Sequence, residues 1–340
     1  MKNMISAERF QEITSKFHQL DPIVVVGDVG IDKYTFGEVK RISPEAPVPV
    51  LEVTKEWLKL GLAANISHNL NTLGVKSTLC GVVGNDNNAN IFDNLLEDEK
   101  LNTWGIVRSS ERPTIFKERV TTNTQQICRI DYESSKSIDE TTEQKVLLRV
   151  KEFVTTHKAI IIEDYAKGTL TQSLISSLIS QFSSNGLLVA VDPGRSTPPL
   201  YYKGASLLKP NLLEAKSMVE SLGYKEKKLE TMAKILVDKL NLKMLVITLG
   251  ADGMALLDVK NQPELKIIPT VANEVFDVSG AGDTAISVLT SSLLAGATLE
   301  EAAWIGNCAS GVVVGKKGTA TVNLEELNLF FQNLVKKINH

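Results

Sequence analysis

Short apolar runs alternate with helical patterns along most of this 340-residue chain. The runs are rich in β-branched residues, which favour buried strands, and they occupy residues 23–26, 78–83, 159–162, 187–191 and 244–249. Patterns typical of helices lie at residues 63–73, 91–101, 142–155, 170–182 and 229–240, and in a pair of segments after Gly282. This alternation predicts an α/β fold in which helices cover both faces of a mostly parallel central sheet. Such sheets bind ligands at the carboxyl ends of their strands, where residues 27–28, 163–164, 192–193 and 249–250 fall.

Two stretches depart from the alternation. Residues 43–50 contain three prolines, which suit an edge segment rather than a helix or a central strand. Residues 114–132 alternate between apolar and polar side chains, as a half-exposed antiparallel strand pair does. We therefore expect one domain over residues 1–340, with a small β-sheet lid formed by segments at approximately 34–56 and 113–132.

The composition is that of an ordinary globular protein, with 43% hydrophobic and 23% charged residues. A net charge of −3 gives no basic excess, so we expect no nucleic-acid partner. Cys80, Cys128 and Cys308 are widely spaced and predict reduced thiols in a cytoplasmic protein. The first 21 residues are too charged for a signal peptide, and no apolar run approaches membrane-spanning length.

The sequence Asp-Val-Ser-Gly-Ala-Gly-Asp-Thr at residues 277–284 is the strongest functional signal. Gly280, Ala281 and Gly282 allow close approach to a backbone whose free N–H groups, at the start of a helix, favour a phosphate. Asp283 would repel such an anion unless it accepts a proton from an attacking hydroxyl, so the pairing indicates phosphoryl transfer. The alternative is a glycine-rich helix start with a favourably placed Asp.

The same glycines also fit the G-x-G-x-x-A pattern of dinucleotide-binding folds, with Glu300 and Glu301 about twenty residues on. In those folds the acid ends a second strand. Here residues 298–301 predict a capping box that opens another helix. Two successive helices leave no strand for a ribose-binding acid, which excludes this class.

Several motifs in order resemble the PfkB, or ribokinase-like, carbohydrate kinases over essentially the full length. Residues 277–284 are similar to the second signature of that family, and residues 61–65 followed by 73–74 are similar to the first. Within the family, the chain most resembles the D-glycero-β-D-manno-heptose-7-phosphate kinases of lipopolysaccharide-core synthesis. The resemblance rests on residues 26–34, 41–50, 164–168 and 313–322.

This resemblance implies a ribokinase-like fold and an ATP-dependent sugar kinase that phosphorylates the anomeric hydroxyl of heptose 7-phosphate to the 1,7-bisphosphate. It implies ATP and Mg²⁺, leaves a monovalent cation open, and implies a homodimer that pairs through the lid. Many such kinases are fused to a nucleotidyltransferase. Because this sequence ends at His340, we expect the stand-alone kinase.

The resemblance also assigns roles around the phosphates. Asp283 is the expected general base, and Gly280, Ala281 and Gly282 are expected to donate N–H groups to the transferred phosphoryl. Asn211 is expected to contact ATP and Glu214 to hold Mg²⁺ through water, although this pair also fits a helix capping box. The nucleotide is expected near Thr248, Leu249, Gly250 and Asn307, and residues 250–253 equally fit a hairpin turn.

The sugar is expected to bind Asp28 and Asp32, both predicted in a loop after the first strand, together with Gly61 and Asn65. A turn-forming Asp and a helix cap are the alternatives for the two acids and for Asn65. The phosphate of the substrate needs cations, and the candidates are Arg41, Lys117, Arg119, Arg129 and Lys167, each of which is alternatively a solvated surface charge.

Two departures from the family pattern bear on the substrate. Leu62 replaces the second glycine of the first signature, and Gly194-Arg195 stands where a lysine is usual after Asp192-Pro193. If the backbone at this position needs a positive φ or a close approach of the sugar, Leu62 alters the sugar site. A cation near the phosphates has then moved to Arg195 or been lost. The alternatives are therefore a kinase for another sugar or sugar phosphate, and a non-catalytic ligand-binding relative.

Overall fold

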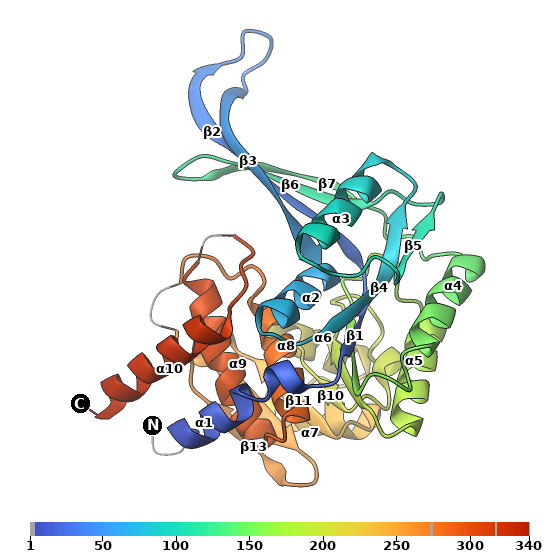
Figure 1. The fold of residues 1–340 in the computed structure, drawn as a ribbon, viewed down its shortest axis with the longest axis vertical. Coiled ribbons are helices and arrows are strands. Elements are labelled where there is room, and N and C mark those ends of the chain that lie inside the picture. Colours follow the sequence, from blue (N-terminus) through green and yellow to red (C-terminus); the bar gives the residue numbers. More distant parts are fainter. Residues whose placement is uncertain (1–3, 273–274, 317, 340) are drawn as a thin grey trace.

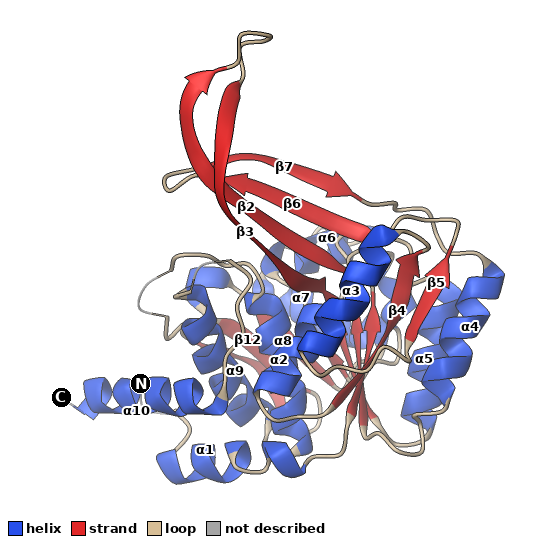
Figure 2. Ribbon diagram, turned by 45° about the horizontal axis from the view of Figure 1, so that its top comes forward, coloured by secondary structure: helices blue, strands red, loops and turns tan. Residues whose placement is uncertain are grey.

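The computed structural model describes residues 4–272, 275–316 and 318–339. A nine-stranded sheet forms its centre, in the order β13-β12-β11-β10-β9-β8-β1-β4-β5 (Figures 1 and 2). Neighbouring strands from β11 to β5 pair in parallel, and β12 and β13 add an antiparallel edge. The strands are β1 (Ile23–Gly27), β4 (Ser77–Gly84), β5 (Ile106–Ser109), β8 (Ala159–Glu163), β9 (Leu188–Asp192), β10 (Leu207–Leu208), β11 (Met244–Thr248), β12 (Met254–Asp258) and β13 (Gln262–Ile268).

Helices cover both faces of this sheet because alternate strand residues point to opposite sides. On β1, Val25 packs into one hydrophobic core, and Val24 and Val26 pack into the other. The first core contains side chains of α1 (Ala7–Thr14), α2 (Ala63–Thr72), α3 (Asn87–Asp98), α8 (Ala281–Leu294), α9 (Leu299–Val314) and α10 (Leu324–Asn339). The second contains those of α4 (Glu140–Lys151), α5 (Gln172–Ser184), α6 (Leu212–Ser221) and α7 (Leu229–Leu240). The expected α/β architecture, with helices on both faces of a mostly parallel sheet, is confirmed.

The two ends of the chain pack together on one side of the molecule (Figure 1). The rings of Phe10 on α1 and Phe331 on α10 stack with centroids 3.8 Å apart. None of the helices in the described stretches combines the length and the apolar character that crossing a bilayer requires.

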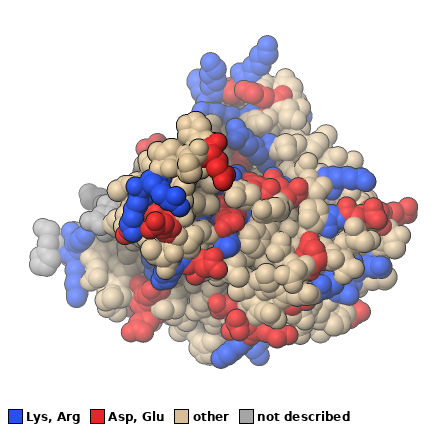
Figure 3. Space-filling view, turned by 90° about the horizontal axis from the view of Figure 1, so that it is seen from above, with Lys and Arg blue, Asp and Glu red and all other residues tan. Residues whose placement is uncertain are grey.

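A second, four-stranded sheet rises from the main body in the order β3-β2-β6-β7 (Figure 2). Its strands are β2 (Val29–Ile42), β3 (Pro49–Leu62), β6 (Ile115–Thr121) and β7 (Gln126–Tyr132). β2 and β3 form a long antiparallel hairpin, β6 pairs with β2 in parallel, and β7 closes the sheet. We call these four strands the small sheet. Seen from above, basic and acidic side chains are interspersed over the surface (Figure 3).

Residues 43–48 connect β2 to β3, and the backbone N–H of Ser43 donates to the carbonyl of Val48 at 2.8 Å. Pro49 and Val50 begin β3, which is an edge strand of the small sheet. The structure corrects one local prediction. Asp32 lies within β2, and only Asp28 separates β1 from β2, so the predicted loop after the first strand is wrong. The chain passes from β1 directly into β2 of the second sheet.

Candidate active site

Helix α8 begins at the glycine-rich turn, at the carboxyl ends of the parallel strands. Gly280 is its N-cap with φ 80°, a conformation that favours glycine. A Cβ atom there would lie 3.0 Å from Asn65 Nδ2 and 3.1 Å from Thr319 Cγ2, so the position is also crowded. The first intrahelical hydrogen bond runs from Thr284 N to Gly280 O at 3.0 Å. The amides of Gly282 and Asp283 precede that bond and lie at the positive end of the helix dipole.

Asp283 is buried in the first turn of α8, with 6% of its surface exposed. Asn65 Nδ2 donates to its Oδ2 at 2.6 Å, and the hydroxyl of Tyr165 donates to its Oδ1 at 3.0 Å. Burial raises the pKa of Asp283 from 3.8 to about 6, although the two hydrogen bonds oppose this rise. Asp283 is therefore an ionised acceptor near neutral pH that gains a proton readily. Asn65, at the start of α2, contacts this carboxylate directly.

A row of ionisable side chains lies beneath the same turn. Glu163 ends β8 and Asp192 ends β9, and the two are paired in register. Lys209 follows β10, and its Nζ lies 2.6 Å from Asp192 Oδ2. A Cβ atom on Gly282 would lie 3.5 Å from that Nζ, so the buried ammonium borders the glycine-rich turn. Burial alone would lower the pKa of Lys209, but Asp192 and Glu163 raise it above its ordinary value.

Glu163 is the least satisfied member of this row. Its side chain is 3% exposed, and its Oε2 has no hydrogen-bond partner in the described part of the chain. Burial, with Asp192 and Asp283 nearby, raises the pKa of Glu163 well above its ordinary value. Glu163 falls at one of the strand ends where the sequence predicts ligand binding, but neither Glu163 nor Lys209 was assigned a role from the sequence. The signal for Glu163 is an ionisable residue directly after the fully apolar run 159–162.

Two cavities meet at the glycine-rich turn. One, of about 300 Å³, lies under the small sheet and is lined by Gly280 and Asp283, together with Asp32, Leu62, Lys117, Arg119, Arg129, Tyr165, Ser279 and Thr319. The other, of about 390 Å³, is lined by Ala281 and Gly282 with mostly small or apolar residues, including Thr248, Gly250, Met254, Val275, Val278, Asn307 and Val314. The turn thus separates a polar cavity from an apolar one and offers its backbone to both.

The polar cavity is rich in cations. Parallel pairing of β2 with β6 places Asp32 beside Lys117, and Arg119 Nη1 donates to Asp32 Oδ1. Arg129 on β7 pairs across the strand with Arg119, and its guanidinium binds Asp131 at 2.8 Å. Three of the five cations proposed for a phosphate therefore line one cavity. Each has an acidic neighbour that an incoming anion would compete with.

The structure separates the other two cations from this cavity. Arg41 lies on the exposed distal part of the hairpin, opposite Val50 and about 30 Å along β2 from Asp32. Lys167 binds Glu133, which Lys117 also contacts at 2.6 Å, so it lies in the network next to the cavity. The expectation that all five cations surround one phosphate is wrong for Arg41.

The carboxylate of Asp28 was expected to contact sugar hydroxyls, but in the structure it binds backbone groups. It is fully buried, and its carboxylate accepts backbone N–H groups of Tyr165, Lys167 and Thr169 at 2.9–3.2 Å. Asp28 therefore holds the turn that presents Tyr165 to Asp283. A carboxylate can be saturated by backbone donors in a turn distant in sequence, which no local motif reveals.

The apolar cavity gathers Thr248, Gly250 and Asn307, as expected for the nucleotide residues. Residues 250–252 also form the short turn between antiparallel β11 and β12. Asn307 is committed to the backbone, because its Nδ2 donates to Pro269 O at 2.7 Å. It supports the cavity wall.

Asn211 and Glu214 form a capping box at the start of α6, with hydrogen bonds of 2.9 and 2.8 Å. A bridge to Thr248 places Asn211 beside the apolar cavity. In the described part of the chain, no three His, Cys, Asp or Glu side chains gather so as to hold a metal ion by themselves. The capping bond uses Oε2 of Glu214, so this carboxylate fits a magnesium ion held mainly by phosphates and water.

The two departures from the family pattern have distinct structural consequences. Leu62 adopts φ 59° and ψ −139°, a region that is essentially restricted to glycine, and it lines the polar cavity. Gly194 packs against Asp164, so a Cβ there would lie 2.8 Å from Asp164 Cγ. Arg195 is exposed. The cation that borders the glycine-rich turn is Lys209, not Arg195.

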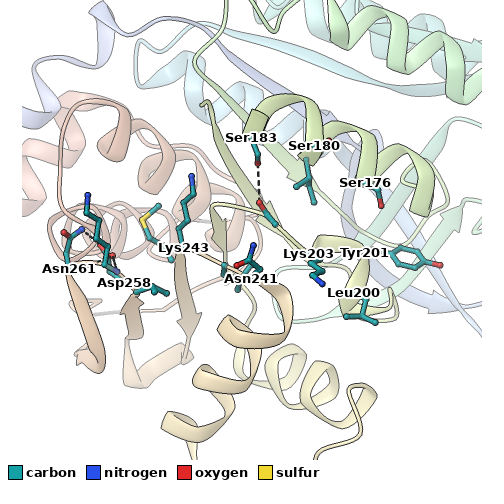
Figure 4. A pocket seen from close by; sticks show the side chains of 16 residues that line it. Ser176, Ser180, Ser183, Leu200, Tyr201, Lys203, Asn241, Lys243, Asp258 and Asn261 are labelled. Carbon is teal, nitrogen blue, oxygen red and sulfur yellow. Dashed lines mark hydrogen bonds between the residues drawn. The ribbon is translucent and has the colours of Figure 1, made fainter. Parts of the chain in front are cut away.

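A larger hollow of about 1020 Å³ lies at the opposite ends of the strands, where Met244 begins β11 (Figure 4). Lys203, Asn241 and Lys243 are among the residues that line it. Its acid, Asp258, is bound by the backbone N–H groups of Lys260 and Asn261 at 3.0 and 3.1 Å and closes its own turn. The hollow contains no acid comparable to Asp283, so we assign the chemistry to the two smaller cavities.

Comparisons with known proteins identify the family of the chain. A family model described as pfkB family carbohydrate kinase matches residues 23–327. "Bifunctional protein HldE" of Sulfurimonas denitrificans is 41% identical over 315 residues, which cover 92% of this chain and 65% of that protein. The HldE protein of Citrifermentans bemidjiense is 40% identical over 319 residues, covering 93% and 65%. The chain therefore spans about two thirds of the length of these curated relatives.

Solved structures share the fold at low identity. Ribokinase from Thermotoga maritima has a TM-score of 0.72 at 20% identity, covering 92% of this chain and all of that one. Phosphofructokinase-2 from Escherichia coli, in complex with fructose-6-phosphate, has a TM-score of 0.73 at 17% identity, covering 93% and 99%. Arabidopsis thaliana ribokinase, complexed with ribose and ATP, has a TM-score of 0.71 at 18% identity, covering 92% and 99%.

Proposed function

The chain belongs to the pfkB family of carbohydrate kinases, and we propose that it transfers the γ-phosphoryl group of ATP to the anomeric hydroxyl of D-glycero-β-D-manno-heptose 7-phosphate. As a member of this family it is a phosphotransferase with an alcohol group as acceptor. The heptose assignment is supported by relatives named HldE at about 40% identity and by the ordered motifs shared with heptose-7-phosphate kinases. The product would be the 1,7-bisphosphate, and the reaction would be a step of ADP-heptose and lipopolysaccharide-core synthesis.

The observation that carries the proposal is the meeting of two cavities at Gly280–Asp283. A nucleotide in the apolar cavity and a sugar in the polar one would bring their reacting groups to opposite sides of the same turn. Phosphoryl transfer depends mainly on such positioning and on electrostatic stabilisation.

In the proposed step, Asp283 accepts the proton of the anomeric hydroxyl as its oxygen attacks the γ-phosphorus. The new O–P bond forms, the bond to the β,γ-bridging oxygen breaks, and ADP leaves with that electron pair. The amides of Gly282 and Asp283 would stabilise the charge on the transferred group, and Lys209 adds a buried positive charge beside the turn.

Asn211 and Glu214 would bind the phosphates and the hydration shell of Mg²⁺, which supplies charge neutralisation between the phosphates when bound. Thr248, Gly250 and the wall supported by Asn307 would enclose the adenosine. The 7-phosphate of the substrate would bind Lys117, Arg119 and Arg129, because guanidinium groups bind phosphate bidentately and an ammonium group adds a point charge.

A different sugar phosphate is the second candidate, favoured by Leu62 in the wall of the sugar cavity. ADP release should therefore be measured with heptose 7-phosphate, fructose 6-phosphate and ribose in parallel. We expect the heptose phosphate to give the highest kcat/KM, and Asp283→Asn to lower that value by about 10²–10⁴-fold while retaining ATP binding. A higher kcat/KM with fructose 6-phosphate would contradict the heptose assignment. Near-normal turnover by Asp283→Asn would contradict the role of Asp283 as the general base.

We also propose a cytoplasmic homodimer joined through the small sheet. Cysteines 80, 128 and 308 are free thiols, as expected in a reducing compartment. Several apolar side chains of the small sheet are exposed, namely Val39, Ile42, Val53, Ile130 and Tyr132. Light scattering should give twice the chain mass, and Val53→Lys should give a folded monomer. A monomeric wild type would contradict the dimer.

A further inference from the structure

Thr319 connects the small sheet to the nucleotide side of the molecule. Thr319 belongs to the connection between α9 and α10, and it is 7% exposed. Its backbone N–H donates to the hydroxyl of Tyr34 at 3.0 Å, and its Oγ1 lies 3.0 Å from the same hydroxyl. Its carbonyl accepts a hydrogen bond from Lys59 Nζ. The small sheet thus supplies a partner for all three polar atoms of Thr319.

The small-sheet side of this contact is firmly held. Tyr34 on β2 is directly opposite Trp57 on β3, and the two rings stack with centroids 5.3 Å apart. The guanidinium of Arg119 lies 5.4 Å from the centre of the Tyr34 ring. Lys59 is opposite Asp32 in the same hairpin. Residues that line the proposed sugar cavity therefore also fix the side chains that hold Thr319.

The other side of the contact leads to the glycine-rich turn by two routes. Gly318 N donates to Asp277 Oδ2 at 3.1 Å, and Ser279 N donates to Asp277 Oδ1 at 2.9 Å. Thr319 Cγ2 also packs against Gly280, 3.1 Å from the position that a Cβ atom would take there. A shift of Thr319 would therefore displace residues 277–280, which precede the amides that face the phosphate.

We propose that Tyr34 and Thr319 are positioning residues that couple the small sheet to the glycine-rich turn, so that sugar binding and nucleotide binding strengthen each other. The proposal rests on the proposed function for the identity of the two ligands. A sugar held between the small sheet and Asp283 fixes Tyr34, Tyr34 fixes Thr319, and Thr319 fixes the backbone at Gly280. Coupling of this kind is reciprocal, because each ligand changes the affinity for the other by the same factor.

The first test uses the ligand-free chain. Tyr34→Phe removes the shared hydroxyl and keeps the ring that stacks on Trp57. Thr35→Val is the matched control. Thr35 is the residue of β2 after Tyr34, and its side chain points to the opposite face of the small sheet. The substitution deletes the hydrogen bond from Thr35 to Glu118. We expect amide hydrogen exchange of residues 277–284 to be about tenfold faster in Tyr34→Phe and unchanged in Thr35→Val. Faster exchange confined to residues 318–319 would overturn the coupling.

The second test measures the coupling itself. The Kd of a non-hydrolysable ATP analogue with Mg²⁺ is determined with and without the sugar that gives the highest turnover. In the wild type we expect the sugar to tighten nucleotide binding about tenfold or more, and in Tyr34→Phe we expect most of this factor to be lost. An equal factor in both proteins would refute the proposal. A wild type with no sugar-dependent ADP release would refute the proposed function instead, and the exchange experiment would still decide the coupling.

Discussion

Replacing Tyr165 with Phe should move the acid limb of the pH–rate profile to higher pH. The hydroxyl of Tyr165 donates to Asp283 Oδ1 at 3.0 Å, and this bond stabilises the ionised carboxylate. The pKa of Asp283 is about 6 with that bond present. A hydrogen bond to a charged group contributes about 1.5–3 kcal/mol, and one pH unit corresponds to about 1.4 kcal/mol.

The expected shift is about one pH unit, because Asp283 borders a cavity from which water can partly replace the lost donor. The general base must be ionised, so kcat/KM falls about tenfold for each pH unit below the pKa. Tyr165→Phe should therefore lose about tenfold relative to the wild type on the acid limb. On the neutral plateau, where Asp283 is ionised in both proteins, the loss should be smaller.

The assay is ADP release, from which kcat/KM is obtained between about pH 5 and pH 9. The substrate phosphate also titrates near pH 6, but it does so equally with every variant, so the difference between proteins reports the enzyme. Tyr224→Phe, which removes the hydroxyl of an exposed ring between α6 and α7, is the control and should leave the profile unchanged. A profile for Tyr165→Phe that is lowered at all pH values, with the same midpoint, would refute the reasoning.

Three further outcomes concern stability. Burial raises the pKa of Asp283 from 3.8 to about 6, so the ionised carboxylate destabilises the fold increasingly as the pH rises between these two values. Asp283→Asn should therefore raise the free energy of unfolding by up to about 3 kcal/mol at neutral pH. Urea denaturation should show that this gain vanishes below about pH 4. At position 62, with φ 59° and ψ −139°, Leu62→Gly should be more stable than Leu62→Ala by about 1–3 kcal/mol, and thermal unfolding that favours Ala would show that the backbone is unstrained. Lys209→Met should cost about 3–5 kcal/mol because it leaves Asp192 buried without its partner, and adding Asp192→Asn should restore most of the loss; a double variant as unstable as the single one would contradict this ion-pair account.

The sequence predicted the parts of this molecule that are encoded locally. The apolar runs gave the strands around β1, and the eight residues from Asp277 gave the turn and the start of α8. The contacts between distant segments could not be predicted in this way. Asn65 meets Asp283 across 218 residues, and only folding shows that its amide binds the carboxylate.

The cations show the same limit. Lys117, Arg119 and Arg129 share a cavity because β2 pairs with β6 in one particular register, whereas Arg41 on the same hairpin lies far away. Charge alone does not distinguish these residues. Lys209 was missed because a lysine after a strand has no characteristic motif, although the sheet places it beneath the glycine-rich turn.

The parallel pairing of β2 with β6 has a consequence for biosynthesis. The hairpin of β2 and β3 leaves the ribosome first, and β6 is translated roughly fifty residues later, which takes several seconds at typical elongation rates. During that interval the inner edge of β2 has no strand beside it, although it will later be central in its sheet. Nascent chains are therefore most prone to mispairing with one another between the synthesis of Leu62 and that of Thr121.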